Sequence, residues 1–193
     1  MKKILFICLI LLLSACTKNT SSKTPNELVL GIKDYSCKMK ISYFSNKNNS
    51  EYNALQNYSA SGKYYMEFLD DTNLKISFEN SILNISSASN SSITNENYSE
   101  LNQNPLFLSY FLNTYFNIEE SEKIKIDENS IFLNLPSYND YLVSAKLTFN
   151  NNLPCSLTYF DKNGNVKVNI IYNEFTLITW CNIFDCVLFF MLK

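Results

Sequence analysis

The chain has 193 residues, of which 16 are Lys or Arg and 18 are Asp or Glu, and it contains no His. A net charge of -2 with scattered lysines gives no basic patch for phosphates, so no nucleic-acid partner is expected. The lack of His removes the usual general base and the commonest metal ligand, and neither a metal nor a cofactor is expected. The length fits one domain.

The first sixteen residues have the pattern of an export signal, with residues 1–15 as the signal peptide. Lysines follow Met1, an apolar run extends from Ile4 to Leu13, and small residues precede Cys16. The run is too short to span a bilayer as a stable helix. Its end, Leu-Ser-Ala-Cys, resembles the bacterial lipobox, which implies cleavage before Cys16 and attachment of a diacylglycerol, with acyl chains such as palmitate, to the Cys16 thiol. The alternative is a plain secretory signal with an incidental Cys.

Residues 16–24 are polar and lack periodicity, which predicts a flexible tether. The tether ends in Thr24, and Pro25 and Glu27 follow it. Thr, Pro and Glu at these spacings form a capping box with Pro at the first helical position. The pattern predicts a short helix that reaches about Asp34.

Beyond Tyr35 apolar and polar residues alternate, which predicts a meander of antiparallel strands. The expected strands lie around residues 38–43, 51–58, 64–69, 74–78 and 83–85. Residues 86–97 are rich in Ser and Asn and of low complexity, so this segment is expected to be a loop.

One stretch, LFLSYFLNTYF at residues 106–116, has clear helical signals. Its apolar arc covers about half of a helical wheel and leaves Ser109 and Asn113 outside. The arc consists of Phe107, Leu108, Phe111, Leu112, Tyr115 and Phe116. Aromatic side chains on such a helix are either core residues or a binding surface for a partner or an apolar ligand. The candidates for binding are Phe107, Tyr110, Phe111 and Tyr115.

After this helix the alternation resumes. Strands are expected near 124–126, 131–135, 143–149, 157–159 and 166–172, and the Asn163-Gly164 pair predicts a hairpin between the last two. At Thr176 the composition changes abruptly, so the domain is expected to cover 25–175 and to be followed by an atypical apolar tail, 176–193. Three interpretations of the tail remain open: a last strand, an amphipathic segment at the membrane, or translation past the natural frame.

The cysteines of the domain and tail match no zinc or redox spacing. Cys37 and Cys155 are either a disulfide, because export favours oxidation, or two small buried apolar side chains. Cys181 and Cys186 belong to the tail.

Two groups of carboxylates could in principle serve a glycan-cleaving enzyme. They are Asp70 with Asp71, and Glu119 with Glu120 and Glu122. Their surroundings are typical of a turn and of a solvated segment after a helix. No nucleophile elbow or phosphate-binding glycine loop is present, so the sequence predicts a protein that is not an enzyme.

Five segments in order resemble the germination lipoproteins of spore-forming clostridia, the GerS-type family. They are YSCKMKI (35–41), KYYME (63–67), LFLSYFL (106–112), LTYFDKNGN (157–165) and IIYNEF (170–175). The resemblance implies a mainly β fold with some α, a LolA-like half-open antiparallel β-barrel with helices on its concave side. The chain departs from the pattern at Gly62 and Tyr65, where relatives commonly have Pro and Arg.

The same resemblance implies a non-catalytic lipoprotein on the outer side of the cell membrane, in the envelope of the developing spore. Its expected partner is an amidase that modifies cortex peptidoglycan and is needed for germination. A second hypothesis is a carrier or sensor of lipid, which needs an open apolar cavity with an exit. A scaffold for a protein partner, in contrast, can fill its barrel with Phe111 and its neighbours. A glycan-cleaving enzyme would need two carboxylates that face each other in a cleft.

We predict that Cys16→Ala abolishes labelling of the protein by a fatty-acid analogue, because the Cys16 thiol is the expected acyl acceptor. Labelling is measured in membranes of cells grown with the analogue. Cys8→Ala changes another thiol of the same signal and should leave the label intact. Label that persists in Cys16→Ala would contradict the lipobox interpretation.

Overall fold

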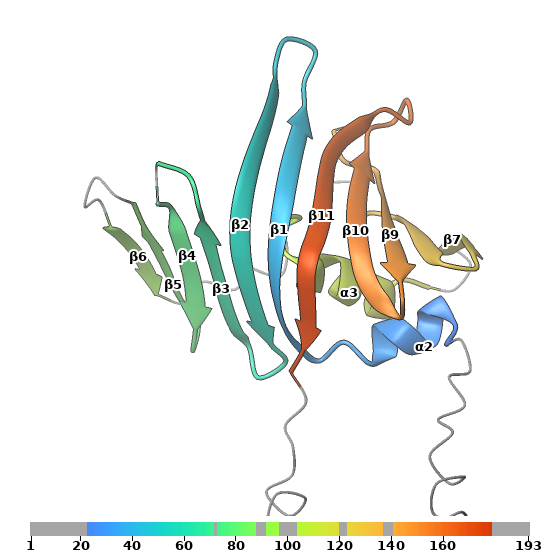
Figure 1. Ribbon diagram of the computed structural model, residues 1–193, viewed down its shortest axis with the longest axis horizontal. Coiled ribbons are helices and arrows are strands. Elements are labelled where there is room, and N and C mark those ends of the chain that lie inside the picture. Colours follow the sequence, from blue (N-terminus) through green and yellow to red (C-terminus); the bar gives the residue numbers. More distant parts are fainter. Residues whose placement is uncertain are drawn as a thin grey trace, which may run out of the picture.

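The computed structural model describes residues 23–71, 73–87, 92–96, 104–119, 123–136 and 141–178. This part of the chain forms one antiparallel sheet and two helices (Figure 1). The helices are α2 (Pro25–Leu30) and α3 (Leu108–Asn117). The strands are β1 (Asp34–Phe44), β2 (Asn49–Ser59), β3 (Lys63–Phe68), β4 (Lys75–Glu79), β5 (Ile82–Ser86), β6 (Ser92–Glu96), β7 (Lys123–Asp127), β8 (Ser130–Asn134), β9 (Ser144–Asn150), β10 (Leu153–Phe160) and β11 (Val166–Leu177). The predicted signal peptide, Cys16 and the tether up to residue 22 lie outside the described residues.

The order of the sheet is β6-β5-β4-β3-β2-β1-β11-β10-β9-β8-β7. Neighbours in the sheet are therefore also neighbours along the chain, except where β1 meets β11. These two strands pair from Tyr35 opposite Leu177 to Tyr43 opposite Val168, with a bulge next to Lys38. Their pairing joins two meanders into one sheet, whose edges are β6 and β7.

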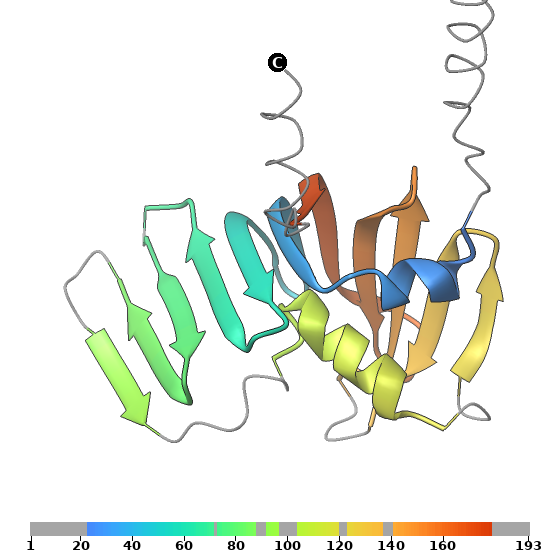
Figure 2. The same cartoon turned by 90° about the horizontal axis from the view of Figure 1, so that it is seen from below.

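The sheet curves, and both helices lie inside the curve (Figure 2). Phe107, just before α3, packs against Tyr64 of β3 with ring centroids 5.8 Å apart. Tyr110 packs against Tyr159 of β10 at 6.5 Å. The helix therefore crosses the concave face from β3 toward β10. The predicted fold class is confirmed: a mainly β protein with a half-open antiparallel sheet and helices on its concave side.

The alternation predicted from the sequence builds the core. In β1, Tyr35, Met39 and Ile41 are at most 1% exposed, whereas Lys38 and Lys40 point to the other face. Strands β3, β9 and β10 show a similar alternation, in which buried residues face the core and the residues between them are more exposed. One apolar core thus fills the space between the sheet and α3.

The predicted capping box begins α2. The Thr24 backbone N–H donates to Glu27 Oε2 at 2.8 Å, and the Glu27 N–H donates to Thr24 Oγ1 at 3.4 Å. The helix ends at Leu30, earlier than the predicted end near Asp34. It stops because Asp34 already pairs with Ser59 as the first residue of β1.

The predicted loop at residues 86–97 is wrong in part, because β6 lies within it. This strand pairs with β5, so that Ile93 lies opposite Ile85 and Thr94 opposite Asn84. The Thr94 hydroxyl donates to Asn84 Oδ1 at 2.9 Å. Composition pointed to a loop, but the β-branched residues in its centre favour a strand once β5 offers an edge.

The end of the domain also differs from the prediction. Strand β11 continues through Thr176 and Leu177, which lie opposite Ser36 and Tyr35. The half-buried Leu177 packs against the core. The sheet therefore extends past the predicted boundary at residue 175, while residues 179–193 of the predicted tail lie outside the described residues.

Two positions of the predicted helical wheel are corrected. Ser109, placed outside the apolar arc, is fully buried, and Phe116, placed within it, is 51% exposed. The buried side of α3 therefore differs from the predicted arc at these two positions.

Gln56 of β2, which is fully buried, joins the start of α3 to the sheet. No side chain of its own segment caps α3, whose N-cap residue is Phe107. Instead, Gln56 Oε1 accepts from the Leu108 N–H at 3.5 Å, and Gln56 Nε2 donates to the Leu106 carbonyl at 3.1 Å. The Tyr35 hydroxyl donates to the same Oε1 at 2.6 Å. One side chain thus satisfies polar groups at the start of the helix and in the core.

We predict that Gln56→Leu destabilises the domain by about 3 kcal/mol. The substitution leaves three buried polar groups without their partner, and each such loss costs on the order of 1 kcal/mol or more. Urea unfolding measures the effect. The matched control is Asn53→Ala, at an exposed position of the same strand, which should change stability by less than about 0.5 kcal/mol. Equal stability of the two variants would show that Gln56 does not hold α3.

The hairpin predicted at Asn163-Gly164 is confirmed between β10 and β11. Its centre is Asp161, whose carboxylate accepts from the Asn165 side chain at 3.0 Å and from the backbone N–H groups of Asn163 and Asn165 at 2.9 Å. Lys167 Nζ lies 3.2 Å from the same group. The hydrogen bond from the Asn165 side chain comes first among the causes that lower the pKa of Asp161 from 3.8 to about 2.

The lowered pKa predicts a pH dependence of stability. Because the folded chain favours the ionised carboxylate of Asp161, this contribution is complete above about pH 4 and is lost as the pH falls toward about 2. We expect Asp161→Asn to lower the urea midpoint at neutral pH, and its difference from the wild type to shrink across that interval. A difference that stays constant down to the lower pH would contradict the assignment.

Candidate functional site

The four aromatic residues predicted to bind a partner or ligand are buried. Phe107 and Phe111 are 0% exposed, Tyr115 is 7% and Tyr110 is 8% exposed. The Tyr115 hydroxyl donates to Asn26 Oδ1 at 2.9 Å and so links α3 to α2. The structure places these side chains in the core, because an aromatic helix lowers its free energy most by packing on the sheet. In this arrangement the four side chains present almost no surface to which a partner or ligand could bind.

The interior beneath α3 is neutral. Burial raises the pKa of Tyr35, Tyr159 and Tyr172 well above the ordinary value, and it raises the pKa of Cys37 to about 12. The Cys37 thiol therefore stays protonated, as does the phenol of each tyrosine. Cys37 is a buried free thiol and Cys155 is a half-buried free thiol. Of the two predicted alternatives, the structure therefore has two separate thiols and no disulfide between them.

The apolar concave face continues beyond the helices. We define the open apolar face as Ile76, Phe78, Leu83, Ile85 and Ile93 of β4, β5 and β6. The register aligns them in cross-strand rows that start from Tyr64 and Met66 of β3, which belong to the core. Leu83 is buried, Ile76, Phe78 and Ile85 are partly buried, and Ile93 on the edge strand β6 is 63% exposed. Neither described helix lies under these strands (Figure 2).

Sequence reasoning missed this surface as a site. The alternating residues of β4 and β5 were assigned to strands, but their position beyond the end of α3 depends on the strand order. Ile93 lay in a segment predicted to be a loop. Ile85 of β5 and Ile93 of β6, which lie opposite each other, were the available signal.

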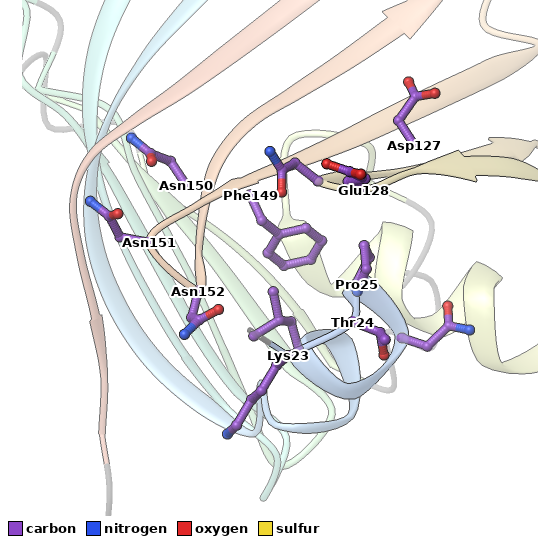
Figure 3. A pocket seen from close by; sticks show the side chains of 12 residues that line it. Lys23, Thr24, Pro25, Asp127, Glu128, Phe149, Asn150, Asn151 and Asn152 are labelled. Atoms are coloured by element: carbon purple, nitrogen blue, oxygen red, sulfur yellow. The ribbon is translucent and has the colours of Figure 1, made fainter. Parts of the chain in front are cut away.

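A polar pocket of about 850 Å³ lies between the start of α2 and two turns of the sheet (Figure 3). Its walls are residues 23–26 with Leu28, the turn between β7 and β8, and the turn between β9 and β10. Amides dominate the lining, which includes Asn26, Asn129, Asn150, Asn151 and Asn152. Asn151 and Asn152 have φ values of 50° and 65°, a region that Asn tolerates well and that tightens the turn. The pocket offers many neutral hydrogen-bonding groups.

The pocket also holds two carboxylates, Asp127 and Glu128, in a single turn. Asp127 Oδ2 lies 3.6 Å from Lys146 Nζ and accepts from Ser130 Oγ at 3.5 Å. Retaining and inverting glycosidases need carboxylates on opposite sides of the scissile bond. Adjacent residues of one turn do not provide that arrangement.

Three of the carboxylates singled out from the sequence, Asp70, Asp71 and Glu119, are described, and none of them lines this pocket. Asp70 and Asp71 lie in the predicted turn after β3, where the Asn73 N–H donates to the Asp70 carbonyl at 3.1 Å. Glu119 is exposed after α3, whereas Glu120 and Glu122 lie outside the described residues. The described residues contain no cluster of three His, Cys, Asp or Glu side chains that could hold a metal. Among the same residues, no helix is long and apolar enough to cross a membrane.

The family model described as "Sporulation protein YdcC-like" matches residues 1–179. The chain belongs to this family. The predicted link to sporulation is thus confirmed, while membership of the GerS type is not confirmed. No individual curated protein matches the YdcC-like chain significantly.

Several solved structures are similar to this YdcC-like protein. An uncharacterized conserved protein from Thermus thermophilus has a TM-score of 0.50 at 9% identity, covering 80% of this chain and 87% of that one. A LolA superfamily protein from Nitrosomonas europaea has a TM-score of 0.38 at 9% identity, with 82% and 95% covered. MucB in complex with MucA from Pseudomonas aeruginosa has a TM-score of 0.42 at 11% identity, with 78% and 54% covered. At these identities a likeness concerns the fold alone.

Proposed function

We propose that the chain is a non-catalytic, lipid-anchored protein of the spore envelope that binds a protein partner through its open apolar face. The partner we propose is the amidase that modifies cortex peptidoglycan for germination. Membership of a sporulation family supports the setting. The lipobox at Cys16 supports an anchor on the outer side of the membrane.

The observation that carries this proposal is that α3 covers only one part of the apolar concave face of the sheet. Beneath α3 the space is filled by Phe107, Phe111 and Leu112, all at most 3% exposed. A lipid carrier would need that space as an open cavity, so the filled interior favours a scaffold. Beyond α3 the same surface reaches the exposed Ile93. Burying an exposed apolar side chain of this size in an interface contributes about 1.5 to 3 kcal/mol.

The edge strand adds a second means of binding. Among the described strands, β6 pairs only with β5 and forms one end of the sheet. A partner strand can add to such an edge through backbone hydrogen bonds, while its side chains pack on the apolar face. Backbone pairing would supply affinity, and Ile85 and Ile93 would select for an apolar partner.

The tether restricts where the partner must be. Lys23, the first described residue, follows Cys16 by seven residues. A fully extended chain of that length spans at most about 25 Å. A lipid on Cys16 would therefore hold the domain at the surface of its own membrane, which suits a scaffold better than a soluble carrier.

The proposal predicts that Ile93→Asp lowers recovery of the amidase at least tenfold, since a carboxylate buried in an apolar contact costs about 1.4 kcal/mol or more. The tagged full chain is isolated from sporulating cells, and the recovered amidase is quantified. The matched control is Ile171→Asp, at a 40% exposed position of β11 opposite Lys40, on the convex face. Equal loss in both variants, or recovery of bound lipid without an amidase from the wild type, would overturn the proposal.

A further inference from the structure

A second pocket, of about 400 Å³, lies over β2 to β5. Four of its lining residues form a row across the strands. Asn57 lies opposite Tyr65, Tyr65 opposite Ser77, and Ser77 opposite Asn84. The row brings together one aromatic ring, two amides and one hydroxyl from four strands.

This row belongs to the convex face of the sheet. Tyr64 packs against Phe107 on the concave side. Successive residues of a strand point to opposite faces, so Tyr65 points away from α3 and its cross-strand neighbours do the same. The pocket row is therefore on the face opposite to the open apolar face.

Tyr65 is held in a defined position. Its hydroxyl donates to Glu67 Oε2 at 2.6 Å, and Glu67 Oε1 lies 3.0 Å from Lys75 Nζ. The ring is half-buried, so part of it remains accessible. An aromatic ring fixed in this way is a platform on which the C–H face of a ligand ring can pack without a large loss of side-chain entropy.

The lining of the pocket combines apolar side chains, such as Ile178, with hydrogen-bonding groups that carry no net charge. Asn57 and Asn84 carry amides that both donate and accept, and Thr94 orients the Asn84 amide through the bond to its Oδ1. The two charges that line the pocket, Lys63 and Glu79, form an ion pair with each other. A phosphate would need an excess of positive charge, which the lining of this pocket does not supply.

We propose that this convex pocket binds a neutral oligosaccharide, with one sugar ring stacked on Tyr65 and with hydroxyl or acetamido groups of this ring and of its neighbours bonded to Asn57, Ser77 and Asn84. A pyranose has one apolar C–H face and a rim of hydroxyls, which matches a ring platform bordered by amides. The volume lies within the range of small-ligand sites. The inference stands on the pocket alone and needs neither the anchor nor the amidase.

The test is calorimetric titration of the full chain with two neutral glycans, a β-1,4-linked tetramer of N-acetylglucosamine and the corresponding tetramer of glucose. We expect binding of at least one of them. Tyr65→Ala should weaken it about tenfold, as expected for loss of an aromatic contact. Tyr65→Phe keeps the ring and should stay within about threefold of the wild type.

Tyr141→Ala is the matched control, because Tyr141 is 50% exposed and does not line this pocket. Should Tyr65→Ala not fold, the exposed pair Asn57→Ala with Asn84→Ala decides, and it should weaken binding at least tenfold. Absence of binding of both tetramers to the wild type would overturn the proposal. Equal affinities of the wild type and the folded pocket variants would overturn it as well.

Discussion

The buried hydrogen bonds of Gln56 determine how the helix and the sheet are joined. Helix α3 starts without a side-chain cap of its own, so its first turn depends on an acceptor supplied by β2. The bond from Tyr35 to the same oxygen places this contact within the core. A buried polar group that lost these partners would destabilise the fold, so the start of the helix is confined to one place on the sheet.

The position of α3 in turn divides the concave face. From its start at β3 the helix runs toward β10, and its aromatic side chains fill that half of the curve. The strands on the other side of its start keep an apolar surface that neither described helix covers. The filled half is the basis for proposing a scaffold rather than a carrier, and the open half is the surface that the proposed partner would bury.

Strand alternation gives the two faces different chemistry. Tyr64 and Tyr65 are neighbours in sequence, but the ring of Tyr64 packs against Phe107 in the core, whereas the hydroxyl of Tyr65 donates to Glu67 on the other face. Salt bridges such as Lys38 with Glu174 and Lys40 with Glu51 keep the convex face solvated and close to neutral. The proposed partner site and the proposed glycan site therefore lie on opposite faces of the sheet.

Local patterns in the sequence determined the elements: the capping box at Thr24 begins α2, the Asn163-Gly164 pair forms the last hairpin, and alternation locates most strands. The tertiary structure alone decided that β1 pairs with β11, that β6 is a strand and that Phe111 is core while Ile93 is exposed. These outcomes depend on contacts between residues far apart in the chain, such as Lys38 and Glu174, which no local pattern encodes. The aromatic helix was visible in the sequence, but the surface that it leaves uncovered depends on where Gln56 holds it.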